Sequence, residues 1–147
     1  MEKQHNRGQD GAGLATLKFD LSAGKKYIHR FRSNGSSPIK EVFSEVNSYH
    51  EVIEERNPDL LTDPVWAKEN LPSAAELYFG HLRYGTFGGD DIEFVQPIMR
   101  ENNWKSRNLI MAGNFNMTNV DELFKVLIDL GQHPKEYSDT VTVLEKV

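Results

Sequence analysis

A long amphipathic helix is the strongest structural signal in this sequence. Ser37 followed by Pro38 is typical of a helix start, because serine caps free backbone N–H groups and proline fits the first helical turn. The residues behind this start place apolar side chains three or four positions apart, at Ile39, Val42, Phe43, Val46, Tyr49 and Ile53. Such a stripe must pack on an apolar surface, so the chain needs a second layer that this helix covers.

Two strands before the helix are predicted to supply that layer. Residues 14–19 are largely apolar, residues 20–24 favour a turn, and residues 25–33 read as a second strand in which Tyr27 and Phe31 share a face. The short connection predicts an antiparallel hairpin. Because helices and strands are interspersed around it, we expect a layered α+β fold with antiparallel strands and not a doubly wound parallel sheet.

The middle of the chain is expected to consist of short elements. Prolines among apolar residues at 56–74 predict short helical turns. We expect a buried strand at 77–79, which leads into a glycine-rich turn at 80–88. An extended segment is expected at 92–99 and a short buried strand at 108–113.

Two more helices are predicted towards the end of the chain. Asn119, with Glu122 three residues later, is a plausible cap for the first, and Gly131 is a plausible stop. The second helix opens at residues 138–140. The apolar stripe of the first comprises Val120, Leu123, Phe124, Leu127 and Leu130.

Length and composition narrow the class of protein. The 147 residues are enough for one domain with a real core, and 17 basic against 22 acidic residues give a net charge of −5. This balance disfavours general nucleic-acid binding. The sequence contains no cysteine, which excludes disulfides, thiolate metal sites and a cysteine nucleophile within these residues. Neither a membrane span nor a signal peptide is recognisable, so we expect a cytoplasmic protein without membrane partners.

Two generic ligand sites are disfavoured by the sequence. The five histidines are scattered without metal-ligand spacing, and Asp90, Asp91 and Glu93 lack the pattern of a calcium loop, so no metal site is expected. Residues 25–32 mix basic and aromatic side chains, as surfaces that bind single-stranded nucleic acid do. An ordinary strand with one solvent-exposed face explains this mixture better.

Three polar corners remain, each after an apolar strand or at a helix start. They lie at residues 83–86, 114–116 and 138–139. Each alone is an ordinary turn or cap. Together they supply an arginine fork for a carboxylate, an amide that can face an oxyanion, and an acid for an ammonium group. Glutamine is an amino acid that needs those three partners.

Four sequence blocks, at residues 6–13, 80–86, 114–119 and 138–140, resemble in their order the glutaminase domain of class II glutamine amidotransferases. Within that class the chain is most similar to amidophosphoribosyltransferases, because residues 102–105 lead into Gly113 and the block behind it. The resemblance covers nearly the whole chain. It implies the four-layer αββα sandwich of N-terminal-nucleophile hydrolases.

The resemblance also implies an activity. In the family, an N-terminal cysteine attacks the glutamine amide, and water hydrolyses the resulting thioester. In amidophosphoribosyltransferases the released ammonia reacts with phosphoribosyl pyrophosphate in the first step of purine synthesis. The implied partners are L-glutamine, a phosphoribosyltransferase domain and further copies of the complete protein. No cofactor is expected for this chain, since Mg²⁺ would belong to the phosphoribosyltransferase domain.

The resemblance assigns roles to residues of the four blocks. Arg83 would bind the α-carboxylate of glutamine, Asp139 would bind its α-ammonium group, and Thr86 would line the pocket. The Asn114 side chain and the Phe115 backbone N–H would form the oxyanion hole. Arg7, Gly8 and Gln9 would be structural residues that support the site.

Three features depart from the family pattern. Phe115 stands where the family has glycine, and Gly85 stands where serine or alanine is usual. The strand with the nucleophilic cysteine would precede Met1. We therefore expect residues 1–147 to be a single incomplete domain that lacks its first strand and the phosphoribosyltransferase domain. Such a chain should be inactive alone and prone to self-association. The alternatives are a non-catalytic glutamine-binding or interaction module and the glutaminase domain of another class II enzyme.

Overall fold

The computed structural model describes the chain except residues 86–90, 115–116, 135–136 and 147, and except the side chains of His5 and Arg7. The helices within the described part are α1 (Pro38–Arg56), α2 (Pro64–Asn70), α3 (Val120–Asp129) and α4 (Asp139–Lys146). The strands are β1 (Gly11–Leu17), β2 (Ile28–Ser33), β3 (Leu77–Arg83), β4 (Ile98–Arg100) and β5 (Leu109–Met111). Short 3-10 helices are formed by Glu2–Arg7, Pro58–Thr62, Ile92–Phe94 and Lys105–Arg107.

The strands form two small antiparallel sheets. One has the order β2-β1-β3 and the other consists of β4 and β5. In the first sheet Leu14 of β1 lies opposite Phe31 of β2 and Gly80 of β3. The predicted hairpin and the α+β class are therefore confirmed.

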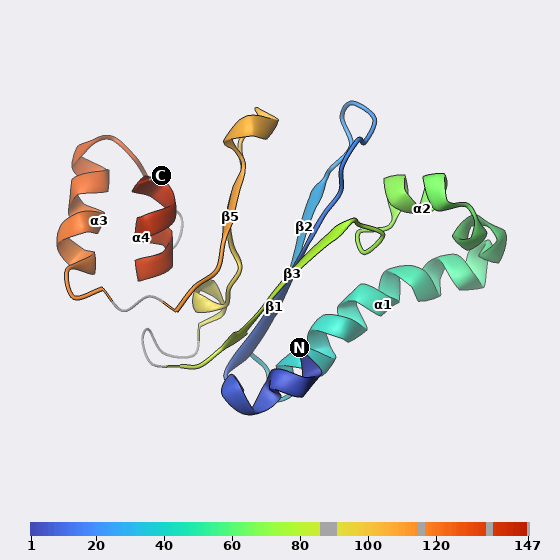
Figure 1. The fold of residues 1–147 in the computed structure, drawn as a ribbon, viewed down its shortest axis with the longest axis horizontal. Coiled ribbons are helices and arrows are strands. Elements are labelled where there is room, and N and C mark those ends of the chain that lie inside the picture. The colour runs from blue at the N-terminus through green and yellow to red at the C-terminus, as the bar shows by residue number, and fades with distance from the viewer. Residues whose placement is uncertain (86–90, 115–116, 135–136, 147) are drawn as a thin grey trace.

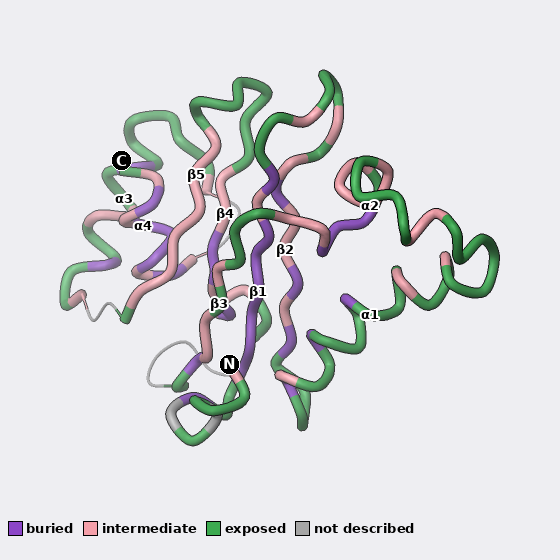
Figure 2. Tube along the Cα trace, turned by 45° about the vertical axis from the view of Figure 1, so that its right-hand side comes forward, coloured by how far each residue is buried: buried purple, intermediate pink, exposed green. Residues whose placement is uncertain are grey.

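Helix α1 covers one face of the three-stranded sheet (Figure 1). Its residues Val42 and Val46 pack on Ala12, Leu14 and Phe31, and all five are buried. The predicted stripe is thus confirmed at its centre. Other members of the stripe are partly exposed: Phe43 lies beside the buried centre, and Tyr49 lies towards the far part of the helix, which extends past the sheet (Figure 2).

The start of α1 is capped in a different way from the prediction. The Ser37 side chain makes no cap hydrogen bond within the described part of the chain. The carboxylate of Glu41 accepts a hydrogen bond from the Ser37 backbone N–H at 3.1 Å and another from the Ser33 hydroxyl. These hydrogen bonds lower the pKa of Glu41. The acid one turn into the helix therefore replaces the serine as the capping group.

The second sheet carries helix α4. Val141 and Leu144 of this helix pack on Ile98 of β4, and Leu109 and Met111 border the same cluster. Helix α1, the three-stranded sheet, the β4–β5 pair and helix α4 follow one another across the molecule (Figure 1). The described residues thus form two helix-covered antiparallel sheets.

Glycines of β1 allow the first sheet and the segment before β4 to approach each other. A Cβ atom added at Gly13 would lie 2.0 Å from the backbone oxygen of Gln96, and one at Gly11 would lie 2.9 Å from a methyl group of Val95. Any larger residue at these two positions would push the segment before β4 away from the sheet. Gly11 and Gly13 therefore bring β1 into direct contact with this segment.

Several expected elements differ from the structure. Strand β3 is longer than predicted, and its first residues are exposed, with 47% for Leu77 and 55% for Tyr78, so the prediction of a buried strand is wrong for these two residues. The segment 92–99 is extended only in part, since it begins with a 3-10 turn. Strand β5 is half-buried. Leu130 is exposed because it lies just beyond the last turn of α3.

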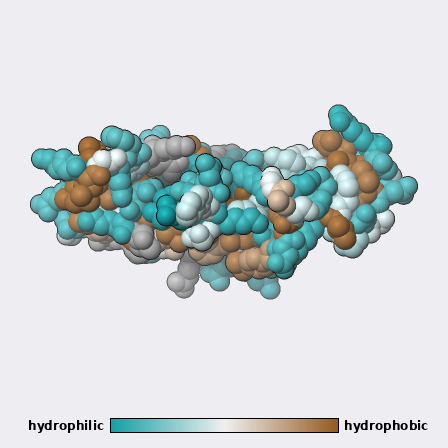
Figure 3. Space-filling model, turned by 90° about the horizontal axis from the view of Figure 1, so that it is seen from above, coloured by the Kyte–Doolittle hydropathy of each residue, from teal (hydrophilic) through white to brown (hydrophobic). Residues whose placement is uncertain are grey.

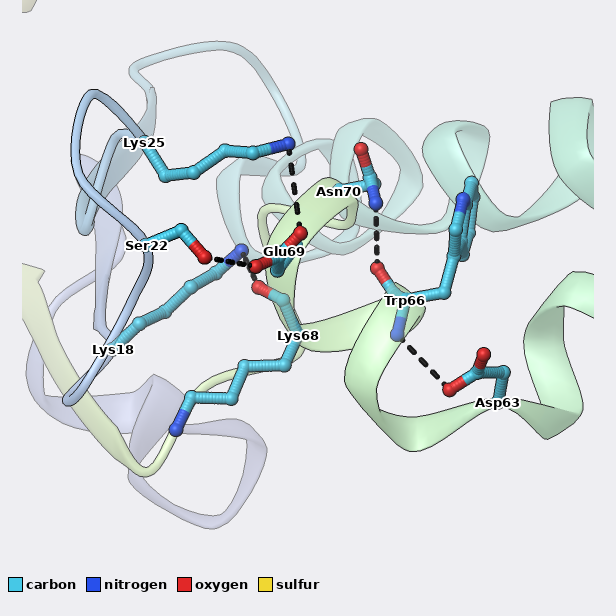
Figure 4. A network of polar contacts seen from close by, with 8 residues as sticks. All are labelled: Lys18, Ser22, Lys25, Asp63, Trp66, Lys68, Glu69 and Asn70. Atoms are coloured by element: carbon cyan, nitrogen blue, oxygen red, sulfur yellow. Dashed lines mark hydrogen bonds and ion pairs between the residues drawn. The ribbon is translucent and has the colours of Figure 1, made fainter.

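The end of β1 is held by polar contacts to the 56–74 region, where the predicted short helical turns are confirmed. The Lys18 ammonium group donates a hydrogen bond to the backbone oxygen of Lys68 at 2.7 Å (Figure 4). It donates another to the backbone oxygen of Leu71 at 2.6 Å. Burial lowers the pKa of Lys18. The Asp63 carboxylate caps α2 by accepting from the N–H groups of Val65 and Trp66.

The visible surface is mainly hydrophilic, with scattered apolar groups (Figure 3). Within the described residues no helix is long and apolar enough to cross a membrane.

Candidate functional site

The first of the three polar corners lies at the end of β3. Arg83 is the last residue of this strand, its side chain is buried, and its guanidinium carbon lies 5.7 Å from the centre of the Phe94 ring. The backbone oxygen of Arg83 accepts a hydrogen bond from the Asp10 N–H at 3.3 Å, and the Asp10 carboxylate accepts one from the Gly85 N–H at 2.7 Å. The 6–13 block is therefore joined to the corner that contains Arg83.

The second corner follows β5. The Gly113 N–H donates a hydrogen bond to Oε1 of Gln96 at 2.6 Å, and the next residue, Asn114, is exposed. The backbone before Asn114 is thus held by a side chain from another segment. Phe115, the other residue assigned to the oxyanion hole, lies outside the described residues.

The third corner is the start of α4, which is confirmed as a helix start. Ser138 is buried, and its hydroxyl oxygen accepts a hydrogen bond from the Val141 N–H at 3.1 Å. The Oδ1 atom of half-buried Asp139 accepts from the Thr140 N–H at 2.7 Å and from the Thr140 hydroxyl at 3.3 Å. Ser138 therefore caps α4, and Asp139 is the first residue of the helix.

The three corners meet at one short segment, residues 94–96. The ring of Phe94 faces Arg83, and Gln96 bonds to Gly113 through its side-chain oxygen. The Nε2 atom of Gln96 donates a hydrogen bond to the Thr140 hydroxyl oxygen at 2.9 Å. Residues far apart in the sequence are therefore gathered around this segment.

The remaining predicted residues are placed only in part. A Cβ atom at Gly8 would lie 2.7 Å from the backbone of Leu82, so Gly8 packs directly on β3. Gln9 is exposed and borders a hollow beside the start of α1, with Ser37 and Phe43 on its other side. Thr86 and the Arg7 side chain lie outside the described part of the chain.

Two residues near the site were not singled out from the sequence. His81 lies two residues before Arg83 on the same face of β3, and burial lowers its pKa. Its buried Nδ1 atom has no hydrogen-bond partner among the described residues. Gln96 is the other, and the only sequence signal for it was a polar residue between apolar ones.

The described residues contain no group of three histidine, aspartate or glutamate side chains that could hold a metal ion. Asp90, one of the three acids considered for a cation, lies outside the described residues.

Comparison with known proteins gives two distant relatives. No family model matches the sequence, and no solved structure matches it. An amidophosphoribosyltransferase of Lacticaseibacillus casei is 30% identical over 144 residues, which are 98% of this chain and 58% of the relative. An amidophosphoribosyltransferase of Methanocaldococcus jannaschii is 32% identical over 125 residues, which are 84% of this chain and 19% of the relative. The chain spans little more than half of the first relative and about a fifth of the second. The protein is thus an α+β chain without cysteine that is distantly similar to amidophosphoribosyltransferases over most of its length.

Proposed function

We propose that this chain is the glutamine-binding part of a class II glutaminase domain that serves an amidophosphoribosyltransferase. The observation that carries the proposal is the meeting of Arg83, the Gly113–Asn114 corner and the start of α4 at residues 94–96. The similarity to two amidophosphoribosyltransferases over most of the chain supports it. The four-layer sandwich of N-terminal-nucleophile hydrolases is the proposed complete fold, and the two helix-covered sheets are compatible with it.

Each corner would contact one part of glutamine. The planar guanidinium of Arg83 matches the α-carboxylate, and its burial beside Phe94 limits the conformations that it must lose on binding. The Asp139 carboxylate would receive the α-ammonium group. The Asn114 amide and the Phe115 N–H would face the amide oxygen, where one donor contributes about 3 kcal/mol to stabilisation of the oxyanion.

The hydrolytic step needs a nucleophile that these 147 residues do not contain. A cysteine thiolate would attack the amide carbon, ammonia would leave, and water would release glutamate from the thioester. Because the chain has no cysteine, it should bind glutamine without releasing ammonia. The same absence favours the second candidate function, a non-catalytic module that binds glutamine.

Isothermal titration of the purified chain with L-glutamine tests the binding function. We expect saturable binding, and about tenfold or greater loss of affinity in Arg83→Gln, since a charge-assisted contact to the α-carboxylate is removed. Arg56→Gln, an exposed arginine at the end of α1, is the matched control and should bind as the wild type does. Circular dichroism identifies variants that lose the fold.

Two results would contradict this function. The first is that the wild-type chain binds no glutamine at millimolar concentrations. The second is that it binds L-glutamine and D-glutamine with equal affinity. An enzyme-coupled ammonia assay on the same sample addresses catalysis. Turnover comparable to that of an intact amidotransferase would show that the cysteine mechanism does not apply to this chain.

A further inference from the structure

The side chain of Gln96 connects two of the three corners. Its Oε1 atom accepts the Gly113 N–H at 2.6 Å, and its Nε2 atom donates to the Thr140 hydroxyl oxygen at 2.9 Å. Thr140 is 1% exposed, so this second contact lies in the interior. A single side chain therefore spans the distance between the strand corner and the helix start.

The chemistry of the partners fixes the direction of these hydrogen bonds. A backbone N–H can only donate, so the Gln96 amide must present its oxygen to Gly113 and its NH₂ group to Thr140. The Thr140 oxygen is then an acceptor, and its own hydrogen is directed to Oδ1 of Asp139, at 3.3 Å. The result is one directed chain of hydrogen bonds from Gly113 through Gln96 and Thr140 to Asp139.

The backbone that carries Gln96 is itself held firmly. Its oxygen lies against Gly13, where no Cβ atom fits. The guanidinium groups of Arg32 and Arg30 donate hydrogen bonds to the backbone oxygens of Val95 and Pro97, at 3.2 and 3.4 Å. The sheet thus positions the segment, and the segment positions the two corners.

We propose that Gln96 is a positioning residue of the glutamine site, which fixes the separation of the Gly113–Asn114 corner from Asp139 and orients the Asp139 carboxylate. Both hydrogen bonds from Thr140 go to Oδ1, so Oδ2 is assigned to the α-ammonium group of the ligand. This inference rests on the proposed function for its ligand, but the chain of hydrogen bonds can be tested without one.

The binding test uses two variants that redirect or remove the hydrogen of Thr140. Gln96→Glu still accepts from Gly113 but cannot donate to Thr140, so the threonine hydroxyl turns from Asp139 towards the new carboxylate. Thr140→Val removes the hydroxyl. We expect each variant to weaken L-glutamine binding about tenfold in isothermal titration. Thr140→Ser retains the hydroxyl and should restore affinity to within about twofold of the wild type.

A second ligand separates positioning from general damage. 4-Carbamoylbutanoate is glutamine without its α-amino group, so it makes no use of Asp139. Its affinity should be unchanged in Gln96→Glu and Thr140→Val. Gln132→Glu, which adds the same charge at an exposed position after α3, is the control and should alter neither affinity. Equal weakening of both ligands, or no weakening of L-glutamine, would overturn the positioning role.

A measurement on the free protein separates this inference from the proposed function. In Gln96→Met, which keeps the volume but removes both hydrogen bonds, the Gly113 amide should exchange its hydrogen at least tenfold faster by nuclear magnetic resonance. If the wild type binds neither ligand while this protection is lost in Gln96→Met, the glutamine function fails and the hydrogen-bond chain stands. If the wild type binds glutamine and Gly113 exchange is unchanged, the chain fails and the function stands.

Discussion

His81 and Arg83 share one face of β3, opposite Gly13 and Gly11 of β1. Two bulky basic side chains fit on this face because the glycines opposite them leave room for the segment before β4. The surroundings affect the two residues differently. Arginine stays charged inside proteins, whereas burial lowers the pKa of His81 and favours its neutral form at neutral pH. The strand therefore presents one cation and one neutral ring beside the proposed glutamine site.

The lowered pKa of His81 predicts a pH dependence of stability. As the pH falls below about 6.5, the unfolded chain takes up a proton at this residue before the folded chain does. The free energy of unfolding should decrease by at most about 1.4 kcal/mol per pH unit for this group, until the pH reaches the folded-state pKa. His81→Gln should give a shallower slope in urea unfolding between pH 7.5 and 5.5.

Some slope should remain in that variant, because burial also lowers the pKa of His29. His133→Gln is the control, since His133 is exposed and should leave the wild-type slope unchanged. An unaltered slope in His81→Gln would show that this histidine is not buried in its neutral form.

At the scale of elements, the contact of β1 with the segment before β4 joins the three-stranded sheet to the part of the chain that leads into the β4–β5 sheet. It depends on the absence of side chains at Gly11 and Gly13, which lets Val95 and the Gln96 backbone approach β1. The apolar clusters lie on the outer sides, where α1 covers the first sheet and α4 covers the second. A change at this inner contact should therefore disturb the site before it disturbs either cluster.

Gly13→Ala tests the inner contact. Its Cβ atom would meet the Gln96 backbone oxygen. This oxygen cannot move aside unless the whole segment before β4 shifts away from β1. We expect a loss of about 1 to 3 kcal/mol in the free energy of unfolding, measured by urea denaturation. Gly80→Ala in the neighbouring strand is the matched control, because the near atoms at its Cβ position belong to the flexible side chain of Met1, and the Gly13 backbone oxygen lies at an ordinary contact distance of 3.8 Å. An equal cost for the two variants would argue against a close inner contact.

At the scale of the whole molecule, the three-stranded sheet ends at β3 among the described strands. The outer edge of β3 carries exposed Leu77 and Tyr78. An apolar edge strand of this kind is a template for pairing with another chain. We therefore expect the self-association that the sequence predicts to occur at the outer edge of β3.

Sedimentation velocity over a tenfold concentration range tests this location. The wild-type chain should show a sedimentation coefficient that rises with concentration, and Leu77→Lys should reduce the rise, because a charge on an edge strand opposes pairing. Leu130→Lys is the control, since Leu130 is 71% exposed beyond α3, away from the edge. A concentration-independent wild type, or equal effects of the two lysines, would contradict pairing through β3.

The helix α1 and the hairpin could be predicted from the sequence because local periodicity determines them, and the start of α4 could be predicted because Ser138 caps it. The position of β3 at a sheet edge could not be predicted, since its apolar residues are those of an interior strand and the pairing order depends on contacts between distant segments. The candidate site divides in the same way. Its residue types and their order at Arg83, Asn114 and Asp139 were visible in the sequence.

Only the tertiary structure brought the three corners to residues 94–96 and placed Gln96 between two of them. Hydrogen bonds such as those from Gly113 to Gln96 and from Gln96 to Thr140 join residues 17 and 44 positions apart. Contacts at such separations leave no periodic pattern in the chain, because they depend on how the sheets pack and not on local conformation. The sequence by itself therefore determined which chemical groups the protein offers, and the packing of the two sheets decided how these groups are held together.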